Sequence, residues 1–266
     1  MAATTPSKGN GESMPPAAPT PMLYTRLEPL NRDKHGALRL SAPDDFAFAR
    51  NAGVAPVTLS EFAVASQYYP IVFLTTRGAA ELTAVAVLGS GPSENVYVDS
   101  AGRWRPGHYV PAYFRRYPFI TADDPKQNRA VVFIDAGSSK LSAKEGTPLF
   151  FKGEPTELGK QTIELCQRYH QAAGLTRRFT SAMVAAGVLV DRVIQASDQK
   201  GGKIAWQGLK AVDQKKLTEV DGKTFLQWRD RNWLAPIYLH QHSLGHFGEI
   251  AATKLAAAGA KPLGKR

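Results

Sequence analysis

Cysteine is the scarcest reactive residue of this chain. The 266 residues include one cysteine, Cys166, so no disulfide can form within the chain. The fold therefore does not depend on oxidation, which fits a reducing compartment.

Long apolar runs are also missing: the longest, Ala182 to Val190, is far shorter than the roughly 18 residues that suggest a membrane span. The N-terminal residues lack the apolar core of a secretory signal. We therefore expect a soluble protein of the cytoplasm.

Motifs that bind phosphate or activate a nucleophile are absent as well. The glycines near Ser90 and Lys203 lack the spacing of a Walker loop or a dinucleotide-binding loop. No G-x-S-x-G elbow is present. Cys166 falls on the apolar side of a predicted helix, where a buried thiol is usually inert. The catalytic residues, if any, are unknown from the sequence, and the pattern favours a protein that is not an enzyme.

Negative charge is in deficit, since 33 Lys and Arg residues face 23 Asp and Glu residues and the formal net charge is +10. Such a charge can attract nucleic acid. Here four of the positive charges come from the C-terminal end, and the others are scattered along the chain, with a few pairs such as Arg177-Arg178 among them. Because no helix carries a one-sided basic stripe, nucleic-acid binding is not favoured. Residues 256–266 read as a basic flexible tail, and residues 1–22, which are poor in apolar bulk, read as a disordered tail.

The periodicity of residues 23–136 indicates a β-rich half with antiparallel pairing. After an extended lead-in over residues 27–48, a short helix from Glu61 to about Tyr68 is predicted with Ser60 as its N-cap. Apolar runs and alternating patterns then predict strands at Ile71 to Thr76, Leu82 to Leu88, Asn95 to Asp99 and Ala130 to Asp135. The second run is apolar on both faces and should lie inside a sheet.

Residues 137–255 read as an α-rich half. Thr156 caps a predicted helix that stops at Gly174, and a second helix follows from Thr176 to Ala186. The remaining predicted elements are a strand over Trp206 to Val212, a short helix capped by Asp213, and helices over Thr224 to Trp233 and Pro236 to Leu255. Strands followed by helices indicate an α+β fold, with residues 23–255 as a single domain.

The residues from Tyr109 to Phe119, which we call the aromatic–arginine segment, combine aromatic side chains, two prolines and an arginine pair. In one interpretation, Pro111 begins a short helix, and Tyr113, Tyr117 and Phe119 pack into the core. The two arginines then point to solvent or pair with carboxylates. We expect at least one of them to stay accessible, because burying two adjacent unpaired cations is costly.

In the other interpretation, the same segment binds a ligand. Arginine forks and tyrosine hydroxyls recognise anions, so Tyr109, Tyr113, Arg115, Arg116 and Tyr117 would contact an anionic ligand or a protein partner. The sequence leaves both interpretations open.

Three residues near the C-terminus form a weak metal-site pattern. His242, His246 and Glu249 lie at i, i+4 and i+7, which is one face of a helix. The internal glutamate of an H-E-x-x-H motif is missing. His240 falls on the opposite stripe and is predicted to be a hydrogen-bonded core histidine. We therefore expect neither a metal nor another cofactor.

The order of several motifs resembles the bacterial SapC family. The resemblance is carried by the stretches Leu27-Glu-Pro-Leu-Asn31, Tyr69-Pro-Ile-Val-Phe73, Glu94 to Trp104, the aromatic–arginine segment, Gly153-Glu-Pro155, Leu209 to Leu217 and Ile237-Tyr-Leu-His240. It implies a cytoplasmic accessory protein that is associated with surface-layer or envelope processes, has protein partners and has no established enzymatic activity. The peptide-transporter permease of the same short name is a different protein, which this chain does not resemble. The alternative is an enzyme or small-molecule binder that holds an anionic ligand through Arg115, Arg116 and the neighbouring tyrosines.

Overall fold

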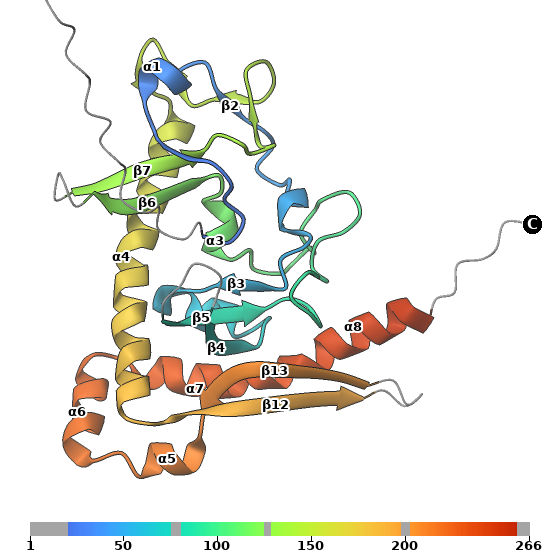
Figure 1. Ribbon diagram of the computed structural model, residues 1–266, viewed down its shortest axis with the longest axis vertical. Helices are drawn as coiled ribbons and strands as arrows, with labels where there is room; N and C mark the ends of the chain where they lie inside the picture. The colour runs from blue at the N-terminus through green and yellow to red at the C-terminus, as the bar shows by residue number, and fades with distance from the viewer. Residues whose placement is uncertain (1–20, 76–80, 125–128, 198–202, 260–266) are drawn as a thin grey trace, which may run out of the picture.

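The computed structural model describes residues 21–75, 81–124, 129–197 and 203–259 (Figure 1). It shows the predicted α+β architecture, with antiparallel sheets mostly in the first half and most helical residues in the second. Among the described residues, no helix is long and apolar enough to cross a membrane.

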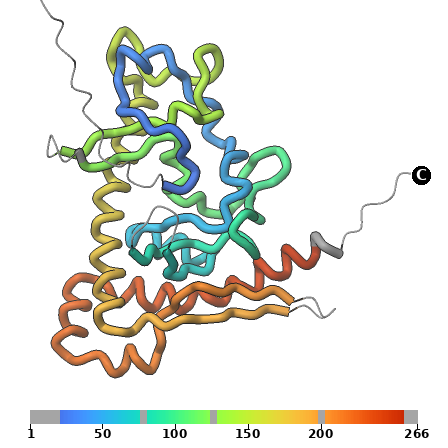
Figure 2. Tube along the Cα trace, viewed as in Figure 1, coloured from blue at the N-terminus to red at the C-terminus, as the bar shows by residue number. Residues whose placement is uncertain are grey.

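A five-stranded antiparallel sheet forms the centre of the fold, in the order β12-β13-β4-β5-β3. Its strands are β3 (Val54–Pro56), β4 (Ile71–Thr75), β5 (Leu82–Val87), β12 (Leu189–Ser197) and β13 (Lys203–Val212). The apolar run of β5 lies between β4 and β3, so the prediction of an interior strand is confirmed. Figure 2 follows the chain out of the first-half strands and back to their sheet through the β12–β13 hairpin.

A second sheet has the order β1-β7-β6 and consists of β1 (Leu27–Pro29), β6 (Phe119–Asp124) and β7 (Arg129–Asp135). Residues 27–48, which the sequence predicts to be extended, thus contribute a paired strand, in which Leu27 lies opposite Asp135. It also contains the short helix α1 (Arg32–His35), the strand β2 (Arg39–Leu40) and the 3-10 turn η1 (Ala47–Ala49). Strand β2 pairs with β8 (Leu141–Ser142) and β9 (Thr147–Pro148), and β10 (Phe150–Phe151) pairs with β11 (Glu154–Pro155).

One helix, α4 (Glu157–Ala185), contacts both β6 of the second sheet and β5 of the central sheet (Figure 1). Thr156 caps it as predicted, accepting a hydrogen bond from the Gly159 amide at 3.2 Å. The predicted stop at Gly174 is wrong, because α4 continues through this residue. A single glycine costs a helix about 1 kcal/mol, which the packing of a long amphipathic helix outweighs. The helix ends before Gly187, which has a φ of 67°.

The other helices are short. They are α2 (Phe62–Ala65), α3 (Ala112–Arg115), α5 (Gln214–Thr218), α6 (Gly222–Asp230), α7 (Leu234–Ser243) and α8 (Phe247–Gly259), with 3-10 turns η2 (Leu59–Glu61) and η3 (Leu244–His246). The cap of the η2–α2 turn is Thr58 rather than the predicted Ser60, because Thr58 and Glu61 form a reciprocal capping box. The predicted helix from Pro236 to Leu255 is interrupted at η3, beside the poor helix former Gly245.

Two strand predictions need correction. Residues 95–99 do not form a strand: the chain turns at Val96 and Tyr97, where the Asn95 side chain accepts a hydrogen bond from the Tyr97 amide at 3.0 Å. Val98 forms only an isolated bridge, to Trp104. Strand β12 was not predicted at all, since most of its side chains are exposed or half-buried and its sequence lacks a clear apolar alternation.

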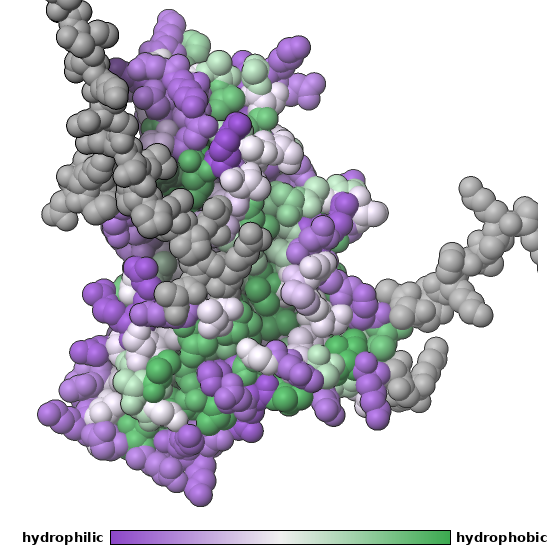
Figure 3. All heavy atoms as spheres, viewed as in Figure 1, coloured by the Kyte–Doolittle hydropathy of each residue, from purple (hydrophilic) through white to green (hydrophobic). Residues whose placement is uncertain are grey.

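Buried apolar side chains form one large cluster around the central sheet and a smaller cluster that includes Phe119, Ile134, Leu149 and Cys166. On the face drawn in Figure 3, hydrophobic residues gather in a band down the middle of the molecule, and hydrophilic residues cover its ends.

Candidate functional site

The aromatic–arginine segment is mainly a packing element. Tyr113, Tyr117 and Phe119 are 4%, 8% and 1% exposed, which confirms the prediction that all three are buried. The hydroxyl of Tyr113 donates to the Met22 carbonyl, and that of Tyr117 donates to the Asp135 carboxylate at 3.2 Å. These rings hold the residues before β1 and the end of β7 against α3.

Arg116 lies inside the molecule, 5% exposed, in a box of three tyrosine rings. Its guanidinium carbon is 4.2 Å from the ring centre of Tyr169, 4.8 Å from that of Tyr113 and 5.7 Å from that of Tyr24. Burial raises the pKa of Tyr113 to about 12 and that of Tyr24 well above its usual value, although Arg116 partly opposes both shifts. The hydroxyls therefore stay protonated at neutral pH. Interactions with the ring faces take the place of water around the cation.

This position corrects the expectation that both arginines point to solvent or pair with carboxylates. Among the described residues, the Nε atom of Arg116 has no hydrogen-bond partner. The neighbouring Arg115 is exposed, so the expectation of at least one accessible arginine is confirmed.

Arg115 is held at the surface by its own segment. It donates to the Val110 carbonyl at 3.1 Å and to the Tyr109 hydroxyl at 2.9 Å. Tyr109 in turn donates to the buried carboxylate of Glu61 at 3.0 Å, which also accepts from the Ala112 amide at 2.7 Å. Burial and the charge of Glu61 raise the pKa of Tyr109 to about 12. Contact of Arg115 and Tyr109 with a ligand stays a prediction.

The metal-site pattern is not built on one continuous helix. His242 belongs to α7, His246 to η3 and Glu249 to α8. Glu249 accepts a hydrogen bond from Arg105 at 3.2 Å, and the Nε2 atom of His246 lies 3.0 Å from the Ser66 carbonyl. In the described part of the chain, no three His, Cys, Asp or Glu side chains are grouped closely enough to hold a metal ion. By contrast, His240 is the hydrogen-bonded core histidine that the sequence predicts, and it is fully buried.

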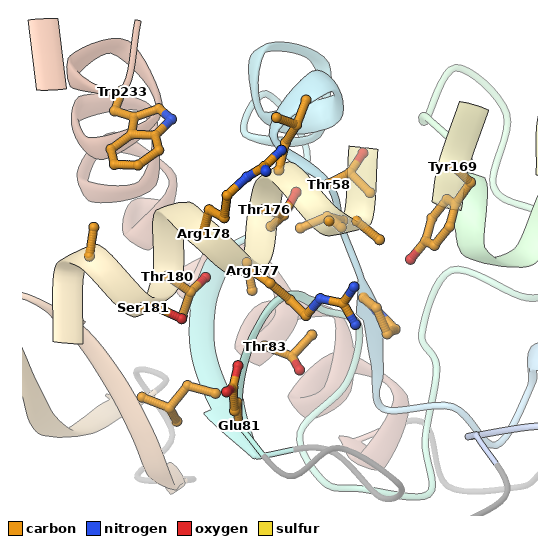
Figure 4. A pocket seen from close by; sticks show the side chains of 18 of the residues that line it. Thr58, Glu81, Thr83, Tyr169, Thr176, Arg177, Arg178, Thr180, Ser181 and Trp233 are labelled. Atoms are coloured by element: carbon orange, nitrogen blue, oxygen red, sulfur yellow. The ribbon is translucent and has the colours of Figure 1, made fainter. Parts of the chain in front are cut away.

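A large groove, which no motif predicted, runs beside α4 and has a volume of about 1430 Å³. We call it the α4 groove. Its walls are α4 between Tyr169 and Ala182, the chain from Pro56 to Thr58, Glu81 with the first residues of β5, and the turn that contains Arg231 and Trp233 (Figure 4). These segments are far apart in the sequence and meet only in the folded molecule.

Positive charge dominates the α4 groove. Arg177, Arg178 and Arg231 line it, against the single carboxylate of Glu81. All three arginines are exposed, and none forms an ion pair with another described residue. The guanidinium of Arg231 lies over the Trp233 ring, 5.0 Å from its centre. Guanidinium groups without a carboxylate partner are suited to bind a carboxylate or phosphate.

Hydroxyl groups line the floor of the same groove. Thr176 is already committed, since its hydroxyl accepts from the Leu59 amide at 2.9 Å and donates to the Ala172 carbonyl at 2.7 Å. Thr180 is 3% exposed, and its hydroxyl has no partner among the described residues. A buried hydroxyl without a partner costs free energy.

The sequence held one signal of this site. Tyr169, Ala173, Thr176, Arg177 and Thr180 recur at helical spacing and share one face of α4. The sequence predicts that one helix ends at Gly174 and that another begins at Thr176, so these residues are assigned to two helices. The pair Arg177-Arg178 is therefore interpreted there as scattered charge.

Comparison with known proteins matches the chain to a family. No curated protein and no solved structure matches the chain. The family model SapC matches residues 30–250, which is most of the chain and includes both the aromatic–arginine segment and the α4 groove. The protein therefore belongs to the SapC family.

Proposed function

We propose that this chain is a non-catalytic binding protein that holds an anionic ligand in the α4 groove. The observation that carries the proposal is the set of exposed guanidinium groups of Arg177, Arg178 and Arg231, which line the groove together with one carboxylate and have no ion-pair partner among the described residues. An anion there would gain charge-assisted hydrogen bonds without breaking existing ones.

The chemistry of the lining favours binding over catalysis. The described side chains around the groove supply hydroxyl, guanidinium and apolar groups and the carboxylate of Glu81, but no histidine or cysteine. Activation of a hydroxyl as a nucleophile needs an adjacent base, and no lining hydroxyl is hydrogen-bonded to Glu81 in the described part of the chain. An accessory role also agrees with the resemblance to the SapC family, from which we draw the proposed link to surface-layer or envelope processes and a cytoplasmic location.

The aromatic–arginine segment has a smaller part in the proposed binding function, because only one of its two arginines is accessible. Arg116 is enclosed by tyrosine rings, so Arg115 is the cation of the arginine pair that a partner can reach. Binding of an anionic ligand by both arginines together, which is the alternative drawn from the sequence, finds less support in this geometry.

The test uses small polyanions as probes. Citrate and inorganic pyrophosphate are titrated into the purified protein by calorimetry at low salt. The double variant Arg177→Gln/Arg178→Gln should weaken binding at least ~10-fold, which corresponds to about 1.4 kcal/mol.

Arg168→Gln is the matched control, because Arg168 is an exposed residue of the same helix outside the groove. Unchanged binding in the double variant, or an equal loss in the control, would show that the α4 groove is not the anion site.

A further inference from the structure

From the backbone around the α4 groove, we infer that its natural occupant is an acidic protein segment, bound in extended form as an added strand along the free edge of β5. This inference rests on the proposed anion-binding function and names the class of ligand.

On the side of the α4 groove, strand β5 extends further than its neighbour β3. Strand β3 pairs with it from Val54 opposite Val87 to Pro56 opposite Val85. The last bond of this ladder runs from the Val57 amide to the Ala84 carbonyl at 3.0 Å. The chain then turns into η2 at Leu59, whereas β5 extends back to Leu82. The beginning of β5 is therefore left without a neighbour on this side in the described part of the chain.

The register shows which backbone groups face the groove. Backbone groups in an antiparallel strand alternate between its two neighbours. The Leu88 amide donates to Gly53, and the Ala84 carbonyl accepts from Val57, so even-numbered positions of β5 face the β3 side. Leu82 has the same parity. Its amide and carbonyl are therefore directed toward the α4 groove, where an unpaired strand edge is a template for an incoming chain.

The opposite wall suits an extended peptide. In Figure 4 the side chains of Arg177 and Thr83 lie on facing walls, and Thr180 and Ser181 lie further along α4. An extended peptide between a strand edge and a helix gains main-chain hydrogen bonds from one wall and side-chain contacts from the other. The volume of about 1430 Å³ also exceeds the roughly 300–1,000 Å³ typical of small-molecule pockets.

Charge complementarity fixes the composition of the peptide. Three guanidinium groups against one carboxylate attract a segment rich in Asp or Glu and repel a basic one. A nucleic-acid strand would satisfy the arginines but has no backbone amide or carbonyl for the edge of β5. The strand edge therefore favours the acidic peptide over nucleic acid.

The experiment measures fluorescence polarisation of a labelled peptide of alternating Glu and Val, titrated with the full-length protein. The expected result is saturable binding that weakens at least ~10-fold in Arg177→Gln/Arg178→Gln and is unchanged in Arg168→Gln. A peptide of alternating Lys and Val should not bind.

Two N-methylated versions of the peptide test the strand geometry without altering the protein. In a strand, residues with the same side-chain face also direct their backbone groups the same way. One version is methylated on all Glu amides and the other on all Val amides. Only one of these two sets of amides can face the edge of β5, so one version should lose binding and the other should keep it. The variant Leu82→Pro, which removes the groove-facing amide at the first position of β5, should weaken the unmodified peptide.

The outcomes separate the two proposals. Binding that is indifferent to both methylation patterns, or a single-stranded oligonucleotide of equal charge that binds as tightly, overturns the strand-addition inference. In that case polyanion binding that depends on Arg177 and Arg178 would still support the anion site. If neither the polyanions nor the peptide respond to these arginines, both proposals fail.

Discussion

Arg115 and Arg116 are adjacent in the sequence but have opposite environments. Arg115 is exposed and bonded to its own segment, whereas Arg116 is 5% exposed and enclosed by three tyrosine rings. Successive residues of a helical turn point in different directions, so the last residue of α3, Arg115, can face solvent while its C-cap, Arg116, enters the core. The pair therefore offers a controlled comparison of the same side chain in two settings.

We predict that Arg116→Ala destabilises the protein by about 2–4 kcal/mol, because it removes the stacked guanidinium and leaves a cavity between the rings. Arg115→Ala should stay within about 0.5 kcal/mol of the natural chain. Thermal unfolding measures both, and Phe119→Ala, which truncates a fully buried ring, is a positive control with an expected cost of about 3–5 kcal/mol.

The variant Arg116→Met separates charge from packing. A buried cation can often be replaced by an apolar side chain of similar length without loss. Recovery of stability in Arg116→Met would show that Arg116 acts by filling space. If Arg115→Ala unfolds as readily as Arg116→Ala, the exposed arginine is also a structural element, and its predicted contact with a partner loses support.

At the scale of elements, α4 connects both sheets and supplies one wall of the groove. Two of its glycines differ in what a methyl group would meet. At Gly174 an added Cβ has no neighbour within 4 Å, whereas at Gly159 it would lie 2.4 Å from the Leu149 carbonyl oxygen. Gly174 therefore lowers the stability of the helix, although no neighbour in the described structure requires a glycine there. At Gly159 a glycine is required, because the backbone at Leu149 lies too close for a larger residue.

We predict that Gly174→Ala stabilises the protein by about 0.5–1 kcal/mol, the gain in helix propensity over glycine. Gly159→Ala should destabilise it, because the carbonyl of Leu149 cannot retreat without disturbing the hairpin before α4. Urea unfolding of both variants gives the comparison. A loss of stability in Gly174→Ala would mean that the helix does not run unbroken through this position.

The elements also show what could be predicted from the sequence. Strands β4 and β5 were predictable, since each is an apolar run with turn signals at its ends. The turn at Val96 and Tyr97 was not, because the alternating pattern there predicts a strand, whereas the local hydrogen bond of Asn95 accompanies a turn. Strand β12 escaped prediction because it is an edge strand with mostly exposed side chains. The hydrophobic periodicity of a sequence reflects which side chains are buried. A strand whose side chains are mostly exposed therefore cannot be recognised from it.

The candidate site was less predictable than the fold. The aromatic–arginine segment is contiguous and visible in the sequence, and its buried aromatics were predicted correctly. The α4 groove combines Thr58, Leu82, Arg177 and Arg231, which belong to four separate segments. No local pattern could bring them together, because their proximity depends on how α4 packs against β5.

At the scale of the whole molecule, His240 joins the two halves of the chain. From α7, its Nε2 accepts a hydrogen bond from the Val212 amide of β13 at 3.0 Å. Its Nδ1 lies 2.6 Å from the Ile71 carbonyl of β4. Because a backbone amide can only donate, Nε2 is unprotonated and the ring proton is on Nδ1. Burial lowers the pKa of His240 to about 4.

Acid should therefore weaken the fold through His240. The unfolded chain binds a proton near pH 6.5 and the folded chain only near pH 4, so the contribution is fully present above pH 6.5 and is lost as the pH falls toward 4. The loss amounts to about 3 kcal/mol, from a shift of roughly 2.5 units at 1.36 kcal/mol each.

Urea unfolding at several pH values from 7 to 4 measures this dependence. His240→Gln should be less stable at neutral pH but should lose less on acidification, because its amide does not titrate. An equally steep loss in the variant would assign the acid sensitivity to other groups.

The burial of Cys166 has a practical consequence for labelling. Its side chain is fully buried, and burial raises the pKa of the thiol to about 12, so hardly any reactive thiolate is accessible at neutral pH. As the chain has no other cysteine, the natural protein already serves as an unreactive background for maleimide chemistry. A variant such as Arg115→Cys would carry one fluorophore or spin label at a chosen surface position, with Cys166 left in place.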